Sequence, residues 1–206
     1  MSPIFRVIGF LLLSIHVLNA HMPRPCAKEN KYLVSQSVLT LHEECSEQSS
    51  YTSQTIYGHL VQVIEEKGNG WALIETEDGY QGYVLMAGVM IDDPRWRTSK
   101  RLYRTRSIGA MIYPAANIER APFARLPFDS RIELISDLES NDHTWLEVQL
   151  LGGKRGWIQR GDIEKIEVKS LGEMINLSHK FVELPYIWGG DFIHWIRLLG
   201  LCSNSI

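Results

Sequence analysis

Two stretches in the middle of the chain repeat one pattern without a gap. "GWALIETEDGYQGYVLMAGV" begins at Gly70, and "TWLEVQLLGGKRGWIQRGDI" begins at Thr144. In both copies a tryptophan is followed eleven positions later by a glycine, which is Gly82 in the first and Gly156 in the second. The other aligned pairs are Trp71 with Trp145, Ile74 with Val148, Gly79 with Gly153, Tyr83 with Trp157, Val84 with Ile158 and Val89 with Ile163. A gapless internal repeat of this kind predicts two similar folded units.

Each copy has the composition of short β-strands. β-Branched and aromatic runs alternate with turn residues, which is the pattern of a small barrel or sandwich. The expected strands are 59–64, 71–76 and 82–86 in the first copy, and 131–136, 145–151 and 156–159 in the second. Gly82 and Gly156 fall inside these runs, where a glycine is typical of a bulge or a tight bend.

The motif "GW…V…DGY.GYV" resembles bacterial SH3-like (SH3b) domains. The resemblance covers residues 31–91 and 100–168. It implies a mainly β protein made of two small SH3-like β-barrels. Domains of this family are extracytoplasmic, occur in tandem and help bind or position cell-wall substrates.

The first 20 residues have the order of a secretory signal peptide. Arg6 precedes an apolar run from Val7 to Leu18, and the small Ala20 precedes a plausible cleavage point at His21. The alternative is an uncleaved membrane anchor. With cleavage, we expect an exported, monomeric protein of the periplasm or cell envelope that has no membrane contact. The 21 basic and 24 acidic residues give a net charge of −3, which argues against nucleic-acid binding.

Export changes how the three cysteines are interpreted. An oxidising compartment permits a disulfide between Cys26 and Cys45, which would leave Cys202 unpaired. The sequence does not show whether the two come close enough. No CxxC or clustered Cys/His spacing is present, so we expect neither a metal nor another cofactor.

A different pattern begins at Lys169. Apolar residues at helical spacing predict one helix, ended by Pro185: Leu171, Met174, Ile175, Leu177 and Phe181. The following "PYIWGG" resembles the start of NlpC/P60 cysteine peptidases. The resemblance implies that residues 169–206 are the N-terminal fragment of an α+β papain-like peptidase domain. It places Tyr186 beside the nucleophile, Trp188 in the core, and Gly189 and Gly190 in a tight turn.

The sequence departs from that family after Gly190. The family continues into Asp-Cys-Ser-Gly, whose cysteine is the nucleophile, but no such motif follows here. Codons can be chosen for residues 191–206 such that deletion of one base restores the Asp-Cys-Ser-Gly motif. This predicts a frameshift near Asp191 that truncated the peptidase domain, leaving Cys202 as a poor candidate nucleophile. The alternative is a genuine short helix in "DFIHWIRLLGL" that docks on a barrel or at a membrane interface.

Three functions remain open at this level. The chain is a cell-wall peptidase of the NlpC/P60 family that lacks its catalytic cysteine and histidine, or a non-catalytic SH3b wall-binding module, or a hydrolase with an unrecognised site. The NlpC/P60 resemblance implies muropeptides as the partner and hydrolysis of D-glutamyl–diamino acid bonds as the family activity. Candidates for the third function are Glu75, Glu77 and Asp78, although a charged hairpin tip is far more often a solvated turn.

The resemblance also implies a substrate-binding role for the first barrel. Family members use an acidic and an aromatic residue of this barrel to hold the free amino end of the substrate. Tyr80 in "DGYQGY" matches the aromatic position, and Glu44 is the candidate acid. A carboxylate beside a tyrosine suits an ammonium group, which can donate charge-assisted hydrogen bonds to it. The alternative for Tyr80 is a turn aromatic without a ligand.

Overall fold

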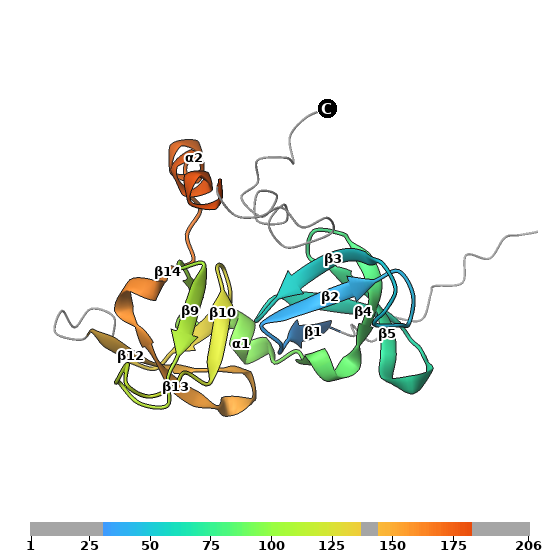
Figure 1. The fold of residues 1–206 in the computed structure, drawn as a ribbon, viewed down its shortest axis with the longest axis horizontal. Helices are drawn as coiled ribbons and strands as arrows, with labels where there is room; N and C mark the ends of the chain where they lie inside the picture. The colour runs from blue at the N-terminus through green and yellow to red at the C-terminus, as the bar shows by residue number, and fades with distance from the viewer. Residues whose placement is uncertain (1–30, 137–143, 183–206) are drawn as a thin grey trace, which may run out of the picture.

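The computed structural model describes residues 31–136 and 144–182 and shows two small β-barrels and two short helices (Figure 1). The expected fold class, mainly β with two SH3-like barrels, is confirmed. The predicted signal peptide, Cys26, the "PYIWGG" motif with Tyr186, Trp188, Gly189 and Gly190, and Cys202 lie outside the described residues.

The two barrels are built from equivalent strands. The first contains β1 (Lys31–Val34), β2 (Val38–His42), β3 (Tyr51–Ile56), β4 (Leu60–Glu66), β5 (Trp71–Thr76), β6 (Gln81–Leu85) and β7 (Val89–Ile91). The second contains β8 (Leu102–Thr105), β9 (Gly109–Ile112), β10 (Ala124–Pro127), β11 (Arg131–Leu134), β12 (Trp145–Gln149), β13 (Arg155–Gln159) and β14 (Ile163–Lys165). β1 pairs with β4 and β7, and β8 pairs with β11 and β14 in the same way.

The strand register reproduces the sequence repeat. Ile74 lies opposite Gly82 in the β5–β6 ladder, and the aligned Val148 lies opposite Gly156 in the β12–β13 ladder. Each barrel encloses its own apolar core, with Ile74 and Val84 fully buried in the first and Val148 and Ile158 in the second. The repeat seen in the sequence therefore corresponds to one β unit folded twice.

The two aligned glycines are needed for close packing, and the β5–β6 and β12–β13 ladders run without a register shift. Of the two expected alternatives, a bulge or a tight bend, the bulge is therefore absent from these two ladders. A Cβ on Gly82 would lie 2.5 Å from Thr52 Oγ1 and 2.8 Å from the Leu41 Cβ. A Cβ on Gly156 would lie 2.5 Å from Ile112 Cγ2. In each barrel the absence of a side chain lets a neighbouring strand cross at close range.

A linker helix, α1 (Pro94–Thr98), joins the barrels. Asp93 caps it, because its carboxylate accepts a hydrogen bond from the Arg95 N–H at 2.9 Å. Trp96 is only 7% exposed. Arg95 pairs with Asp93 at 2.8 Å, and Arg97 pairs with Asp92 at 2.7 Å.

The predicted helix after Lys169 is α2 (Leu171–Ser178), continued by a 3-10 turn, His179–Phe181. Ser170 and Glu173 form a capping box at its start. Leu177 and Phe181 are buried with Ile56 of the first barrel and Phe128 of the second, and the Phe128 and Phe181 rings meet edge-on at 5.3 Å. Leu171 and Ile175 of the expected apolar face are exposed. Met174, Leu177 and Phe181 of that face therefore pack on the barrels, whereas Leu171 and Ile175 do not.

Replacing Gly82 with alanine tests the close approach in the first barrel. We expect Gly82→Ala to lower the free energy of unfolding by about 1–3 kcal/mol, because the new methyl group overlaps Leu41 and Thr52. Gly68→Ala is the control, since no atom lies within 4 Å of the added Cβ. Urea unfolding of the two variants checks this, and equal losses would contradict it.

Candidate functional site

The contact between the barrels is built from two equivalent turns. Tyr57 to His59 connects β3 and β4, and Phe128 to Ser130 connects β10 and β11. Gly58 and Asp129 occupy the matching place in each turn and have positive φ angles of 79° and 64°. A Cβ on Gly58 would lie 2.5 Å from the carbonyl oxygen of Arg131, so a glycine is required there.

Tyr57 belongs to the first barrel but is buried in the core of the second. It is 4% exposed and packs with Ala110, Ile112 and Leu150. Its hydroxyl accepts a hydrogen bond from the backbone N–H of Leu151, and its carbonyl accepts one from Arg131 at 3.1 Å. Burial raises the pKa of the Tyr57 phenol, an effect that the Leu151 hydrogen bond only partly offsets.

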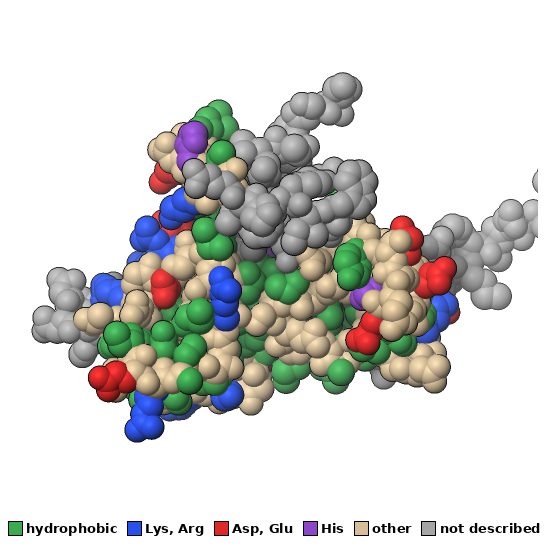
Figure 2. Space-filling model, in the orientation of Figure 1, with side chains coloured by type: hydrophobic (Ala, Val, Ile, Leu, Met, Phe, Trp, Pro, Cys, Tyr) green, Lys and Arg blue, Asp and Glu red, His purple; other side chains and the backbone are tan. Residues whose placement is uncertain are grey.

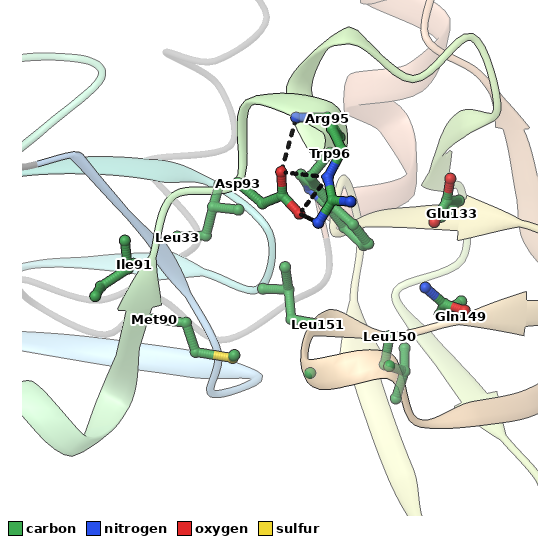
Figure 3. Close-up of a pocket in the computed structure, with 12 residues that line it drawn as sticks. Leu33, Met90, Ile91, Asp93, Arg95, Trp96, Glu133, Gln149, Leu150 and Leu151 are labelled. Carbon is green, nitrogen blue, oxygen red and sulfur yellow. Dashed lines mark hydrogen bonds and ion pairs between the residues drawn. The ribbon is translucent and has the colours of Figure 1, made fainter.

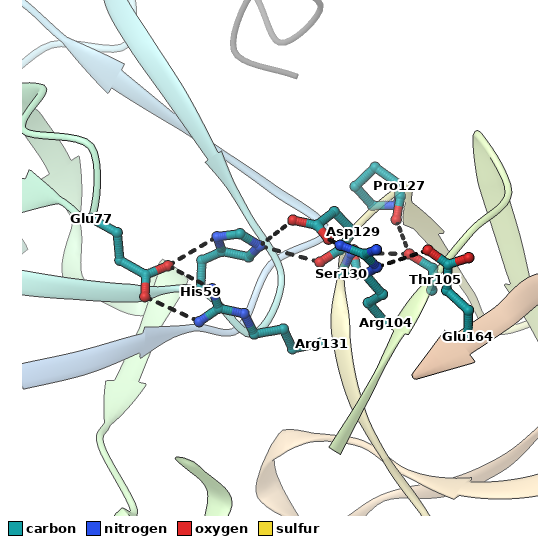
Figure 4. A network of polar contacts seen from close by, with 9 residues as sticks. All are labelled: His59, Glu77, Arg104, Thr105, Pro127, Asp129, Ser130, Arg131 and Glu164. Atoms are coloured by element: carbon teal, nitrogen blue, oxygen red, sulfur yellow. Dashed lines mark hydrogen bonds and ion pairs between the residues drawn. The ribbon is translucent and has the colours of Figure 1, made fainter. Parts of the chain in front are cut away.

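A polar network continues from this turn (Figure 4). His59, 4% exposed, lies between a carboxylate of each barrel, with Nδ1 3.2 Å from Glu77 Oε2 and Nε2 3.6 Å from Asp129 Oδ2. Arg131 of the second barrel contacts both oxygens of Glu77, at 3.0 and 3.1 Å. This two-pronged ion pair joins the barrels directly.

The network extends into the second barrel through Arg104. Its guanidinium lies 3.4 Å from Asp129 Oδ1 and 2.8 Å from Glu164 Oε1. Lys169, just before α2, lies 3.1 Å from the same Glu164 oxygen. Burial acts to raise the pKa of Glu164, but the hydrogen bonds and charges of Lys169 and Arg104 outweigh it and lower that pKa. An unbroken chain of ionisable groups thus runs from Glu77 through His59 to Lys169.

Glu77 lies in an exposed hairpin tip, as the sequence favoured, but the structure adds contacts from its carboxylate to His59 and to Arg131 of the second barrel. Partial burial would raise the pKa of Glu77, but hydrogen bonds and charges from His59 and Arg131 lower it to about 2. The other two acidic residues of the tip have local partners: Glu75 accepts from Gln81 at 2.6 Å and Asp78 accepts from Thr76 at 2.5 Å. All three carboxylates are therefore engaged in structural contacts.

Tyr80 ends the same turn, Thr76–Tyr80, which we call the β5–β6 turn. The Thr76 hydroxyl accepts a hydrogen bond from the Tyr80 N–H at 3.1 Å, and the Tyr80 carbonyl accepts one from the Thr76 N–H at 2.9 Å. The Tyr80 ring is partly buried and packs on the core of the first barrel. The predicted aromatic ligand residue is thus part of a tightly bonded turn.

Glu44 lies elsewhere, in the exposed loop between β2 and β3. Ser49 anchors the loop by accepting a hydrogen bond from the Glu44 N–H at 3.3 Å. Within residues 31–136 and 144–182 the Glu44 carboxylate makes no hydrogen bond or ion pair, so no such contact links it to Tyr80. Cys45 is exposed in the same loop. Its disulfide with Cys26 remains a prediction because Cys26 is outside the described residues.

A cleft of about 520 Å³ opens between the barrels beside α1 (Figure 3). Its apolar lining includes Met90 and Ile91 of the first barrel and Leu151 of the second, and its polar lining includes Glu133 and Gln149. Trp96 also lines it. The described ranges contain no group of three His, Cys, Asp or Glu residues able to hold a metal ion. No helix within them is long and apolar enough to cross a membrane.

The residues joining the barrels were not found from the sequence. Tyr57, His59 and Arg131 fall in or beside turns, and nothing in their local pattern shows that they face a second domain. The only available signal was "YGH" at 57–59, where a glycine that needs a positive φ separates two large side chains.

The depressed pKa of Glu77 predicts a pH dependence of stability. Its pKa falls from an ordinary 4.5 to about 2 on folding, so its stabilising effect is complete above about pH 4.5. That contribution is lost as the pH falls towards 2. Glu77→Gln should lower stability at pH 7 and flatten the decline between pH 4.5 and 2.

Urea unfolding at pH 7 and pH 3 measures this effect. Glu75→Gln is the control, because the Glu75 contact with Gln81 stays within the first barrel. It should cause the smaller loss at pH 7. An acid dependence of the Glu77→Gln variant as steep as that of the unaltered protein would contradict the assignment.

The chain is similar in sequence to known bacterial proteins. The family model described as "Bacterial dipeptidyl-peptidase Sh3 domain" matches residues 41–89. Dipeptidyl-peptidase 6 of Lysinibacillus sphaericus is 24% identical over 182 residues, which cover 84% of this chain and 67% of that protein. The first barrel thus matches a bacterial SH3 domain family directly.

Two solved structures share the fold. An NlpC/P60 family protein from Bacillus cereus aligns with a TM-score of 0.65 at 17% identity, covering 81% of this chain and 71% of that one. An NlpC/P60 endopeptidase from Photobacterium damselae subsp. piscicida aligns with a TM-score of 0.51 at 14% identity, covering 78% of this chain and 39% of that one. The resemblance to NlpC/P60 proteins with bacterial SH3 domains, predicted from the sequence, is therefore confirmed.

Proposed function

We propose that this chain is an exported cell-wall protein of the NlpC/P60 type whose paired barrels bind muropeptides. The observation that carries the proposal is the docked pair of SH3-like barrels, an arrangement that aligns over most of the chain with an NlpC/P60 protein. Burial of Tyr57 in the second barrel makes the pair one unit, which can present a fixed surface to a ligand.

Tyr80 and Glu44 are proposed to recognise the free amino end of the muropeptide. The β5–β6 turn holds Tyr80 firmly, so little conformational freedom is lost when its ring meets a ligand. The loop between β2 and β3 carries exposed Glu43, Glu44 and Glu47 and no basic residue. Figure 2 shows acidic side chains, with a basic one beside them, at the end of the first barrel that points away from the second. The three glutamates of the loop between β2 and β3 favour an ammonium group near Glu44.

Cleavage of the muropeptide is not expected from the described residues. Cys45 is the only cysteine among them, and it makes no hydrogen bond to His42, His59 or His179 within these ranges. A cysteine peptidase needs a thiol activated by a nearby imidazole. We therefore propose binding without turnover, whether the chain descends from an NlpC/P60 endopeptidase or works as a wall-binding module.

One assay tests both parts of this proposal. The purified chain is mixed with a muropeptide containing a D-glutamyl–diamino acid bond. Calorimetry measures binding, and chromatography measures cleavage. We expect binding with an intact peptide. Absence of binding would contradict the wall-binding proposal. Cleavage that Cys202→Ala abolishes would contradict the proposed inactivity.

Replacing Tyr80 tests the binding site itself. We expect Tyr80→Ala to weaken muropeptide binding about tenfold or more, because a rigid aromatic contact is lost. Lys154→Ala is the matched control: Lys154 occupies the aligned position in the second barrel, where its Nζ lies 3.7 Å from the Phe123 ring centroid. Equal binding by the Tyr80→Ala variant and the unaltered protein, measured by calorimetry, would remove Tyr80 from the site.

A further inference from the structure

His59 faces an oxygen acceptor on each side of its ring. Nδ1 lies 3.2 Å from Glu77 Oε2, and Nε2 lies 3.2 Å from the backbone carbonyl oxygen of Asp129. A backbone carbonyl can only accept a hydrogen bond. The Glu77 carboxylate, held ionised by Arg131, can also only accept. Each ring nitrogen therefore needs its own proton to make its contact.

A neutral imidazole cannot satisfy both contacts. It carries one N–H, so the lone pair of its other nitrogen would point at an oxygen. At a site that is 4% exposed, no bulk water is available to replace the missing donor. The imidazolium form donates from both nitrogens and satisfies both oxygens.

The charges around His59 nearly cancel, so they do not determine its protonation state. Three carboxylates, Glu77, Asp129 and Glu164, are matched by three cations, Arg131, Arg104 and Lys169. The arginines that share Glu77 and Asp129 with His59 weaken the pull of these carboxylates on its proton. Because charge balance does not decide the state, the two hydrogen-bond acceptors do.

We propose that His59 carries a proton on both ring nitrogens in the folded protein and, as an imidazolium, fixes the orientation of the two barrels. Its Nε2–H ties the first barrel to the carbonyl of Asp129 in the second. Its Nδ1–H holds Glu77, which is a member of the β5–β6 turn. His59 is therefore also a positioning residue for Tyr80, and this second role rests on the proposed function.

The consequence of losing one His59 proton follows from the number of hydrogen-bond donors on the ring. Loss of one proton from His59 removes one of its two hydrogen bonds and sets a lone pair against an oxygen. Loss of the Nε2 proton removes the bond to Asp129 that joins the barrels. Loss of the Nδ1 proton instead sets a lone pair against Glu77, the carboxylate that pairs with Arg131 across the junction. In either case the barrels are held less tightly, and Tyr80 is positioned less firmly. A protein whose His59 ring carries a single proton should therefore show a less fixed barrel orientation and a lower muropeptide affinity.

Nitrogen NMR of the full chain tests the protonation state directly. The ¹⁵N shifts of the His59 ring separate an imidazolium from either neutral tautomer, and residual dipolar couplings report whether both barrels share one orientation. We expect two protonated ring nitrogens wherever the barrels share one orientation, and loss of the shared orientation together with the second proton. A single protonated nitrogen in a protein whose barrels stay aligned would overturn the inference.

Substitution of His59 provides a second test of the proposal. His59→Gln donates from only one atom, so it should loosen the barrels at every pH and weaken muropeptide binding about tenfold. His42→Gln is the matched control, because His42 is also buried but contacts Tyr51 and Trp71 within the first barrel. A His59→Gln variant with the orientation and affinity of the unaltered protein would overturn the proposal.

The two proposals fail separately. If His59 is an imidazolium and His59→Gln loosens the barrels, the link between them stands even when the unaltered protein binds no muropeptide. That result would refute the proposed function alone. If muropeptide binds but the His59 ring is neutral, the proposed function stands and this inference falls.

Discussion

Tyr57 is the residue on which the arrangement of this protein depends. It lies in a turn of the first barrel, yet its side chain fills part of the core of the second. Withdrawing it would expose a large aromatic surface and leave a cavity among Ala110, Ile112 and Leu150, a change that typically costs several kcal/mol. Two barrels that could otherwise move independently are therefore held as one body.

The polar network beside Tyr57 restricts the relative orientation of the barrels. A buried tyrosine fixes the distance between the barrels, whereas the contacts from His59 to Asp129 and from Arg131 to Glu77 restrict rotation about it. α2 covers the same junction, since Leu177 and Phe181 meet Ile56 and Phe128. Apolar burial and ion pairing thus act at one place, beside the turn that carries Tyr80.

The barrels could be predicted from the sequence because their information is local and occurs twice. Trp71 and Gly82 repeat as Trp145 and Gly156, and the strands follow from the runs between them. The junction could not be predicted, because a residue such as Glu77 lies in an ordinary turn and its contact with the second barrel is to Arg131, 54 positions away. The candidate ligand residues Tyr80 and Glu44 came from a family resemblance, which gives positions but no geometry.

Nuclear spin relaxation measures most directly whether the barrels form one body. We expect backbone amides of β1–β7 and β8–β14 to report the same rotational correlation time, one appropriate to the whole chain. Two shorter and different correlation times, one for each barrel, would show that Tyr57 does not hold the barrels together.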